Sequence, residues 1–275
     1  MRIATAFTMA CVTSAVVAEE WHVQGLAGIP SKSPVCCDSV GQAFIPGGHP
    51  VGASGGAQTF VGSYVVAWPD VTTSPLVLDG GPYEVCWVVE ANQSGDLAVQ
   101  AAICPQSDGA CPAVARLVRL DGSVEEIGDF GGTFLQVRGL NADGTVVGDV
   151  NPPGSVYRCG WVFSDGGARL LPMPASATHA SINDVGDNGA IVGWAYESGV
   201  TGRKPTVWIN DVPATLPTLG GEGEATAVDA NGVMYGHCAR DGRDVAVRWV
   251  DGEVSELPMP AGGVSSRVAV VSGDG

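Results

Sequence analysis

The chain repeats one unit, and this repetition constrains its fold more than any single motif does. Each unit opens with a leucine or isoleucine in a turn rich in glycine and proline, and the openings lie near residues 26, 76, 127, 170, 216 and 257. An Asp-Gly or Asn-Gly turn and an apolar run follow, as in NADGTVVG, DNGAIVG and DANGVMYG. Successive openings are 41 to 51 residues apart, which is the period of a four-stranded propeller blade.

A strand carrying tryptophan recurs with the same period. Its members are Trp68, Trp161, Trp208 and Trp249, and in the second unit LVRLDG puts Arg119 at that position. Because an aromatic residue found once per blade serves every interface alike, we expect these side chains to pack between neighbouring blades. Trp87, Trp194 and Tyr235 fall outside the repeated position, and we expect them in the core as well.

Within each unit, apolar residues alternate over runs of four to seven residues that hairpin signals separate. The 275 residues include 40 glycines and 18 prolines, and only 15% are charged, which favours a turn-rich all-β protein. The expected fold is therefore an all-β, propeller-like array of four-stranded blades, with about five full repeats and a partial sixth.

The repeat resembles the bacterial extracellular HAF repeat, named after a His-Ala-Phe tripeptide. The matching segments are LPTLGG, SIND, GTVVG, AIVG and VWIND. The resemblance covers nearly all of residues 21–275 and weakens in the first two units, where QAAIC at 100–104 lacks the final glycine, and the tripeptide itself is absent. It implies an exported propeller-type protein and assigns no activity.

Strand counting predicts how the repeats begin and end. WHVQGL at 21–26 is expected to be an orphan outer strand, and VSSRVAVV at 264–271 is expected to be a sixth inner strand whose hairpin partner is missing. We therefore expect either a C-terminally truncated propeller or an open array with an exposed edge.

The N-terminus has the layout of a signal peptide. One arginine precedes an apolar run that ends in small residues before Glu19 and Glu20. We expect residues 1–18 to be removed and residues 19–275 to form one secreted or periplasmic domain, because the run is too short for a membrane span. A net charge of −16 disfavours binding to nucleic acid.

Seven cysteines remain after the signal peptide, so at least one is unpaired within the chain. Cys104 and Cys111 close a short loop of turn residues, and we expect a disulfide between them. The pairing of Cys36, Cys37, Cys86, Cys159 and Cys238 stays open, and no spacing is typical of structural zinc.

Candidate catalytic and metal-binding groups all have simpler explanations. GASGG at 52–56 fits a nucleophile-elbow pattern around Ser54 but lacks the helix that this elbow needs. The four histidines, His22, His49, His179 and His237, show no spacing that argues for a triad. Asp184, Asp187 and Asn188 could be calcium ligands, but turn formation explains the segment. The sequence therefore identifies no catalytic residue, metal site or cofactor.

Polar residues end the inner strands of successive units: Asp38, Glu90, Asn141, Asn183 and Asp229. Paired carboxylates at such a position would suit a glycosidase. Asparagine, however, stands where a catalytic acid would have to be, so capping of the neighbouring turns is the favoured interpretation.

The loops between second and third strands vary most between units, and function commonly resides in such loops. The candidate ligand-binding residues on this face are Tyr196, Glu197, Arg203, Arg240, Asp241 and Arg243. We expect a binding or scaffolding module for a glycan or protein ligand. The alternatives are a hydrolytic propeller that uses inner-strand carboxylates, a purely structural surface protein, and neutral variation of the loops.

Overall fold

The structure is a computed structural model that describes residues 36–37, 43–48, 63–67, 76–79, 85–92, 94–102, 113–119, 121–197, 199, 201–259, 261–268 and 271. These residues form twenty strands, and none of them belongs to a helix, so none could cross a membrane as one. The expectation of an all-β chain is confirmed for this part of the protein.

The strands form five antiparallel sheets of four, in chain order. The first sheet contains β1 (Cys36–Cys37), β2 (Ala43–Gly48), β3 (Ser63–Ala67) and β4 (Leu76–Asp79). The second contains β5 (Val85–Ala91), β6 (Leu97–Ala102), β7 (Ala113–Val118) and β8 (Val124–Gly128). The third contains β9 (Phe134–Leu140), β10 (Val146–Asn151), β11 (Cys159–Ser164) and β12 (Gly167–Leu170). The fourth contains β13 (Ala177–Val185), β14 (Ile191–Glu197), β15 (Lys204–Ile209) and β16 (Val212–Thr215). The fifth contains β17 (Gly223–Val228), β18 (Met234–Arg240), β19 (Arg243–Val250) and β20 (Glu253–Glu256).

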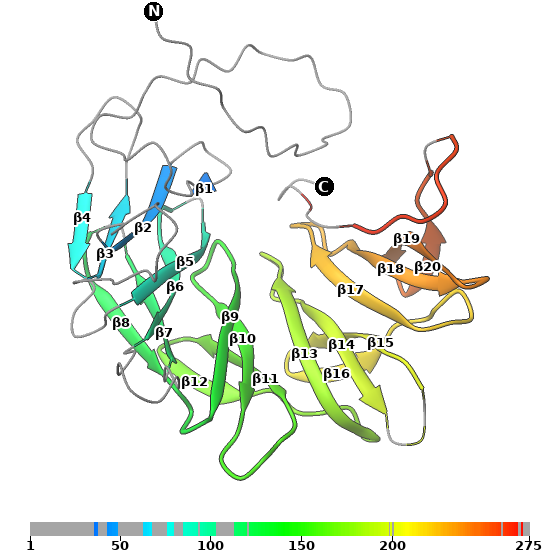
Figure 1. The fold of residues 1–275 in the computed structure, drawn as a ribbon, viewed down its shortest axis with the longest axis horizontal. Helices are drawn as coiled ribbons and strands as arrows, with labels where there is room; N and C mark the ends of the chain where they lie inside the picture. The colour runs from blue at the N-terminus through cyan, green and yellow to red at the C-terminus, as the bar shows by residue number, and fades with distance from the viewer. Residues whose placement is uncertain are drawn as a thin grey trace, which may run out of the picture.

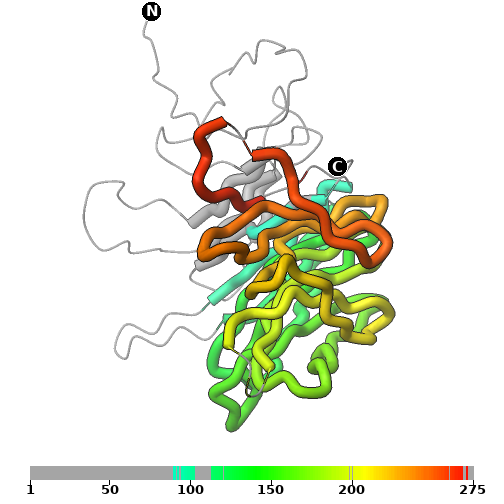
Figure 2. The backbone as a smooth tube through the Cα atoms, turned by 90° about the vertical axis from the view of Figure 1, so that its right-hand side faces the viewer, coloured from blue at the N-terminus to red at the C-terminus, as the bar shows by residue number. Residues whose placement is uncertain are grey.

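The sheets follow one another round an arc, with the first strand of each sheet toward the inside (Figure 1). Each sheet contacts the next along the chain, and the tube in Figure 2 shows the later sheets stacked in sequence. Because strand direction alternates, the connections from second to third strand and from sheet to sheet share one face. We call it the loop face, and the hairpins that join first to second and third to fourth strands occupy the opposite face.

The hydrophobic core lies between consecutive sheets. One cluster joins the second and third sheets around Trp161, another joins the third and fourth around Trp208, and a third joins the fourth and fifth around Trp249. All three indoles are at most 1% exposed. The expected packing of the repeated tryptophans between blades is confirmed for these three, and Trp68 lies outside the described residues.

The register of the tryptophans differs from the sequence-based alignment. Trp208 pairs with Ile191 and Trp249 with Met234, and their indole N–H groups donate to the carbonyls of Pro172 and Pro217. Trp161 pairs with Gly148 instead, two residues away from the equivalent position. In the second sheet that equivalent position is Val118, opposite Leu97, so the assignment of Arg119 was wrong by one residue.

The leucine that opens each unit extends the pairing of the outer two strands of the preceding sheet. The amide N–H groups of Leu171, Leu216 and Leu257 donate to the carbonyls of Gly160, Pro205 and Ala246, each at 2.8 Å. The side chains of Leu171 and Leu216 are buried between the sheets. The residue therefore combines a main-chain bond with an apolar contact, which explains why it recurs.

A β-bulge interrupts the inner strand of the second, third, fourth and fifth sheets at one equivalent position. The residues left out of the pairing are Val89, Arg138, Asn183 and Thr226. A bulge bends its strand and changes the direction of a side chain. Its recurrence therefore gives each repeat one inner-strand residue whose side chain is free for contacts outside the ladder.

In the third, fourth and fifth sheets, the second-strand glycine lies directly against the bulged inner strand. A Cβ on Gly148, Gly193 or Gly236 would overlap a main-chain carbonyl oxygen of the inner strand, that of Gln136, Ser181 or Glu224. The equivalent residue of the second sheet is Val99, opposite Val88. The residue in place of the glycine is therefore Val99, and not the last residue of QAAIC at 100–104. Three units use glycine because the two strands approach closely there.

The hairpins between first and second strands are held by their own polar residues. Asn141 Oδ1 accepts the amide N–H groups of Asp143 and Thr145, and Asp229 Oδ1 accepts those of Asn231 and Val233. The Asn141 side chain also donates to the carbonyl of Gly186 in the next sheet. Turn capping is thus confirmed for Asn141 and Asp229.

The described part of the segment 264–271 lies against the fifth sheet without forming a strand. The Ser266 amide donates to the Asp244 carbonyl at 3.0 Å, as Ala180 does to Arg158 and Gly223 to Arg203 between earlier sheets. Thr226 Oγ1 donates to the Val268 carbonyl. This segment therefore makes the contacts that begin an inner strand in earlier repeats.

We predict that Gly193→Ala lowers the free energy of unfolding by more than about 2 kcal/mol, because overpacking against a main-chain carbonyl cannot be relieved by a rotamer change. Gly167→Ala is the matched control, since its Cβ would have no atom closer than 3.8 Å. Urea unfolding measures both variants. Equal stability of the two would contradict the proposed role of the bulge.

Candidate functional site

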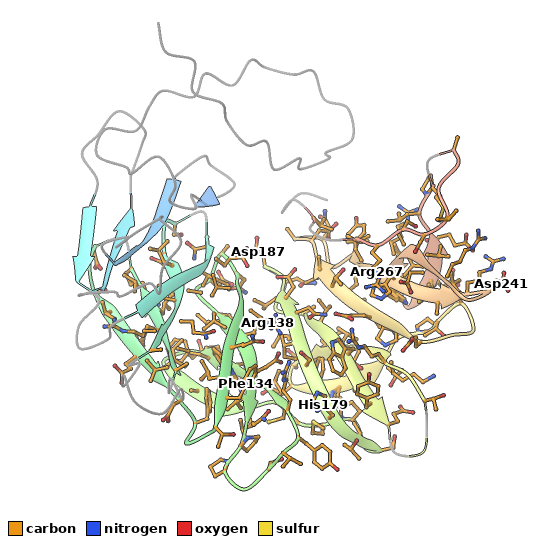
Figure 3. All side chains as sticks on the ribbon, viewed as in Figure 1. Phe134, Arg138, His179, Asp187, Asp241 and Arg267 are labelled. Carbon is orange, nitrogen blue, oxygen red and sulfur yellow. The ribbon has the colours of Figure 1, made fainter. Side chains whose placement is uncertain are left out.

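Two of the six candidate ligand-binding residues, Tyr196 and Arg203, belong to a cluster of aromatic and basic side chains on the loop face. We call it the loop-face cluster, and its members come from the third and fourth sheets and their connections: Phe134, Arg158, His179, Trp194, Tyr196 and Arg203. Figure 3 shows the labelled Phe134 and His179 at neighbouring sheets.

Ring stacking holds the centre of the loop-face cluster. His179 stacks on Trp194 with centroids 5.2 Å apart, and Tyr196 meets Trp194 edge-on at the same distance. The Arg203 guanidinium lies 4.6 Å from the Trp194 ring centroid. Trp194 is 8% exposed, so the expected core position is confirmed, and it supports its neighbours instead of offering a ligand platform.

His179 is fixed in one protonation state by its surroundings. Its Nδ1 accepts the Arg158 amide N–H at 3.2 Å, which requires that nitrogen to be unprotonated. Burial, together with the positive charge of Arg158, lowers the pKa of His179. The imidazole is therefore neutral at neutral pH and adds no charge to the loop-face cluster.

Beneath the loop-face cluster lies a fully buried carboxylate, Asp149 on β10. Its Oδ1 accepts the Ile182 amide at 2.7 Å and its Oδ2 the Ser181 hydroxyl at 2.8 Å. Arg138 Nε lies 3.2 Å and Arg158 Nη1 3.6 Å from the same Oδ2. Burial raises the pKa of Asp149, which these bonds and charges oppose.

A second polar link joins the fourth sheet to the fifth. Asn183 Nδ2 donates to Glu224 Oε1 at 2.9 Å and to the Ala225 carbonyl at 2.8 Å. Glu224 forms an ion pair with Arg203 of the loop-face cluster. Asn183 therefore has a structural role in the interface, beyond the turn that its sequence position suggested.

The other candidate residues form a separate group. Arg240, Asp241 and Arg243 occupy the tip of the β18–β19 hairpin, where Arg240 pairs with Arg243 across the ladder and makes ion pairs with Asp241 and Glu256. Asp241 and His179 lie far apart in Figure 3. Glu197 ends β14, half-buried and opposite Ala177. The structure thus divides the predicted set between the loop-face cluster and this hairpin.

Two inner-strand carboxyl groups have raised pKa values. Glu90 keeps contact with solvent, yet the protein around it, together with the charge of Asp184, raises its pKa to about 8. Burial raises the pKa of Asp184 as well. Both oxygens of Asp184 accept main-chain N–H groups, from Val185 and Val228. Glu90 is therefore the carboxyl group of the two that remains available for chemistry.

The calcium candidates are used within the fold. Asp184 is bonded as described, Asp187 Oδ1 accepts the Ala142 amide, and Asn188 Oδ1 accepts the Ala190 amide. In the described part of the chain, no three His, Cys, Asp or Glu side chains gather as metal ligands would. The turn interpretation holds for Asn188, whereas Asp184 and Asp187 also accept main-chain amides from the neighbouring sheets.

Several candidates lie outside the described residues: Asp38, Ser54, His22, His49, Cys104 and Cys111, with the signal segment 1–18. The predicted Cys104–Cys111 disulfide therefore stays a prediction. Cys159 and Cys238 are buried free thiols, and burial raises the pKa of Cys159 to about 11, so neither is a reactive nucleophile.

Sequence reasoning missed Arg138, Asp149 and Arg158. The signal was present in the residue that follows the second-strand glycine position, which is Gln100, Asp149, Trp194 or His237 in successive units. This position keeps its register while its chemistry changes from one repeat to the next. Gln100 Oε1 accepts the Val137 amide as Asp149 accepts that of Ile182.

No family model and no curated protein matches the chain. Solved structures that it resembles include the acylaminoacyl peptidase of Pyrococcus horikoshii, at 13% identity and a TM-score of 0.54 over 82% of this chain and 38% of that one. TolB from Acinetobacter baumannii is similar at 12% identity and a TM-score of 0.45, over 80% of this chain and 52% of that one. The chain spans about half or less of these proteins, and the likeness shows a propeller-like fold alone.

We predict that Asp149→Ala lowers the free energy of unfolding by about 3–5 kcal/mol, because it leaves two arginines and two donors without their buried acceptor. Asp211→Asn, which removes the negative charge of the exposed Arg169 pair and tolerates the positive φ of this turn residue, serves as the control and should lose less than about 1 kcal/mol. Chemical denaturation of both variants measures this difference in stability. An equal loss in the two variants would show that the bonds of Asp149 do not stabilise the fold.

We predict that raising the pH from 5 to 8 destabilises the protein through Glu90. Between its ordinary pKa of 4.5 and the folded value of about 8, the folded state holds a proton that the unfolded state releases, so stability falls as pH rises. Glu90→Gln should remove this part of the slope in urea titrations. Glu253→Gln, on the exposed edge strand β20, should leave the slope unchanged, and an unchanged slope in both would contradict the assignment.

Proposed function

We propose that the protein is an exported binding module whose ligand occupies the loop-face cluster. The observation that carries this proposal is the convergence of Phe134, Arg158, His179, Tyr196 and Arg203 from different strands and connections onto one face. Such side chains offer apolar rings, cation faces and hydrogen-bond donors together, the combination found in recognition sites. The signal-peptide layout of residues 1–18 and the resemblance to the HAF repeat support export.

Rigidity of the scaffold favours binding over neutral variation of the loops. The cluster residues lie on strands or next to them, and Trp194 fixes His179, Tyr196 and Arg203 through ring contacts. Preorganised side chains lose little conformational entropy when a ligand arrives. Residues that drifted without function would have no reason to be ordered in this way.

A hydrolytic activity is the second candidate, and Glu90 favours it. A carboxyl group with a pKa of about 8 is protonated at neutral pH and can act as a general acid. Loss of glycan or peptide hydrolysis in Glu90→Gln, with binding retained, would support an enzyme. Unchanged binding and no turnover in the wild-type protein would leave binding as the function.

The binding proposal is tested by a glycan array and a peptide library, followed by thermal shift on the chain from Glu19. A ligand present at 100 times its dissociation constant should stabilise the fold by about 2.7 kcal/mol. We predict that Tyr196→Ala abolishes this stabilisation while Arg240→Ala, on the separate hairpin, retains it. The reverse result would move the site to the β18–β19 tip.

A further inference from the structure

We propose that Arg138 and Arg158 form a subsite for a carboxylate group, held in place from below by Asp149. This inference rests on the proposed binding function and names the chemistry of one part of the ligand. The three residues, which we call the Arg-Asp-Arg triad, belong to the third sheet and face the fourth, since Asp149 bonds to Ser181 and Ile182 there.

The charge of the Arg-Asp-Arg triad is unbalanced. Two guanidinium groups approach one oxygen of Asp149, and its remaining bonds come from a neutral hydroxyl and a neutral amide. By contrast, Arg169, Arg203 and Arg267 each pair with a carboxylate of their own. A chain of net charge −16 therefore keeps one excess positive charge at this place.

The arginines also retain unused donors. Arg158 Nε is buried and has no hydrogen-bond partner, and within the described residues the terminal nitrogens of Arg138 have none either. A buried donor without an acceptor is unfavourable. The two side chains are 34% and 26% exposed, so a ligand in solvent can reach their terminal nitrogens, while Nε of Arg158 is buried.

Orientation is fixed before a ligand binds. Phe134 lies under the Arg158 guanidinium, 4.4 Å from atom to ring centroid, which covers one face of the planar group. The Arg158 main chain is bonded to His179 Nδ1, and Arg138 is the bulged residue of β9. The terminal nitrogens of Arg138 and Nη2 of Arg158 therefore remain for an acceptor, and a carboxylate can accept from two such N–H groups at once.

A single negative charge fits this subsite better than a double one. The excess is one positive charge, and the negative charge of Asp149 lies directly against both guanidinium groups. A phosphate dianion would add repulsion from this acid, whereas a carboxylate neutralises the excess. The subsite therefore belongs to a carboxylate-bearing ligand.

The test uses the full mature chain, labelled with ¹⁵N, and follows the arginine Nε–Hε resonances. Sodium acetate, sodium glucuronate and inorganic phosphate are titrated at constant ionic strength made up with chloride. We expect the Arg138 and Arg158 resonances to move saturably with both carboxylates and less with phosphate, while that of Arg169 does not move. Tighter binding of phosphate, or movement of all arginines alike, would overturn the proposal.

Substitutions separate a binding subsite from a purely structural ion pair. Arg138→Gln and Arg158→Gln should each weaken glucuronate binding by about tenfold, and Arg169→Gln should not change it. If either variant fails to fold, Arg138→Lys or Arg158→Lys keeps the charge but loses the paired N–H geometry, and should bind with intermediate affinity. Wild-type affinity in folded triad variants would show a structural pair only.

The outcomes of this experiment and of the ligand screen can be told apart. Saturable acetate shifts without a hit in the screen would support the subsite and show that the screened glycans and peptides are not ligands of the loop-face cluster. A hit that depends on Tyr196 but not on Arg138 or Arg158 would support binding and overturn the carboxylate subsite.

Discussion

In the third, fourth and fifth sheets, the close approach between a bulged first strand and the glycine of the second strand is the constraint on which the packing depends. The bulge leaves Arg138, Asn183 or Thr226 out of the ladder and brings a main-chain carbonyl onto Gly148, Gly193 or Gly236. The third and fourth sheets each present apolar faces to two neighbours. Since no four-stranded sheet can cover both of its own faces, stacking in series is obligatory, and the leucine and tryptophan side chains complete it.

The same constraint produces the site. A bulged residue no longer pairs across its own sheet, so its side chain contacts the next one, as Asn183 contacts Glu224 and Thr226 contacts Val268. The residue after the glycine lies on the neighbouring strand and points toward the same interface. Where these two positions are arginine and aspartate, as in the third sheet, they form an ion pair within that sheet, and Asp149 also bonds to the next sheet. Repetition thus fixes the frame and leaves two positions per repeat free to differ.

The sequence predicted the parts of the fold that depend on local periodicity, and missed those that depend on pairing across strands. The repeat period, the absence of helix in the described residues and the capping role of Asn141 and Asp229 follow from turn chemistry and alternation. The offset of Trp161, by contrast, is set by which residue it faces on β10. Asp149 was missed because one acidic residue in a strand gives no sign of the two arginines that reach it from elsewhere.

The inner-strand acids show why similar positions do not imply a shared chemistry. A glycosidase needs two carboxyl groups free to exchange protons or attack the substrate. Asp184 cannot supply one, because main-chain N–H groups occupy both of its oxygens. The equivalent residue of the third sheet is Gly139 and that of the fifth is Ala227, so Glu90 has no free partner on the inner strands of the third, fourth and fifth sheets. Any reaction at Glu90 would have to use it as a single acid, whereas the loop-face cluster offers several groups that act together.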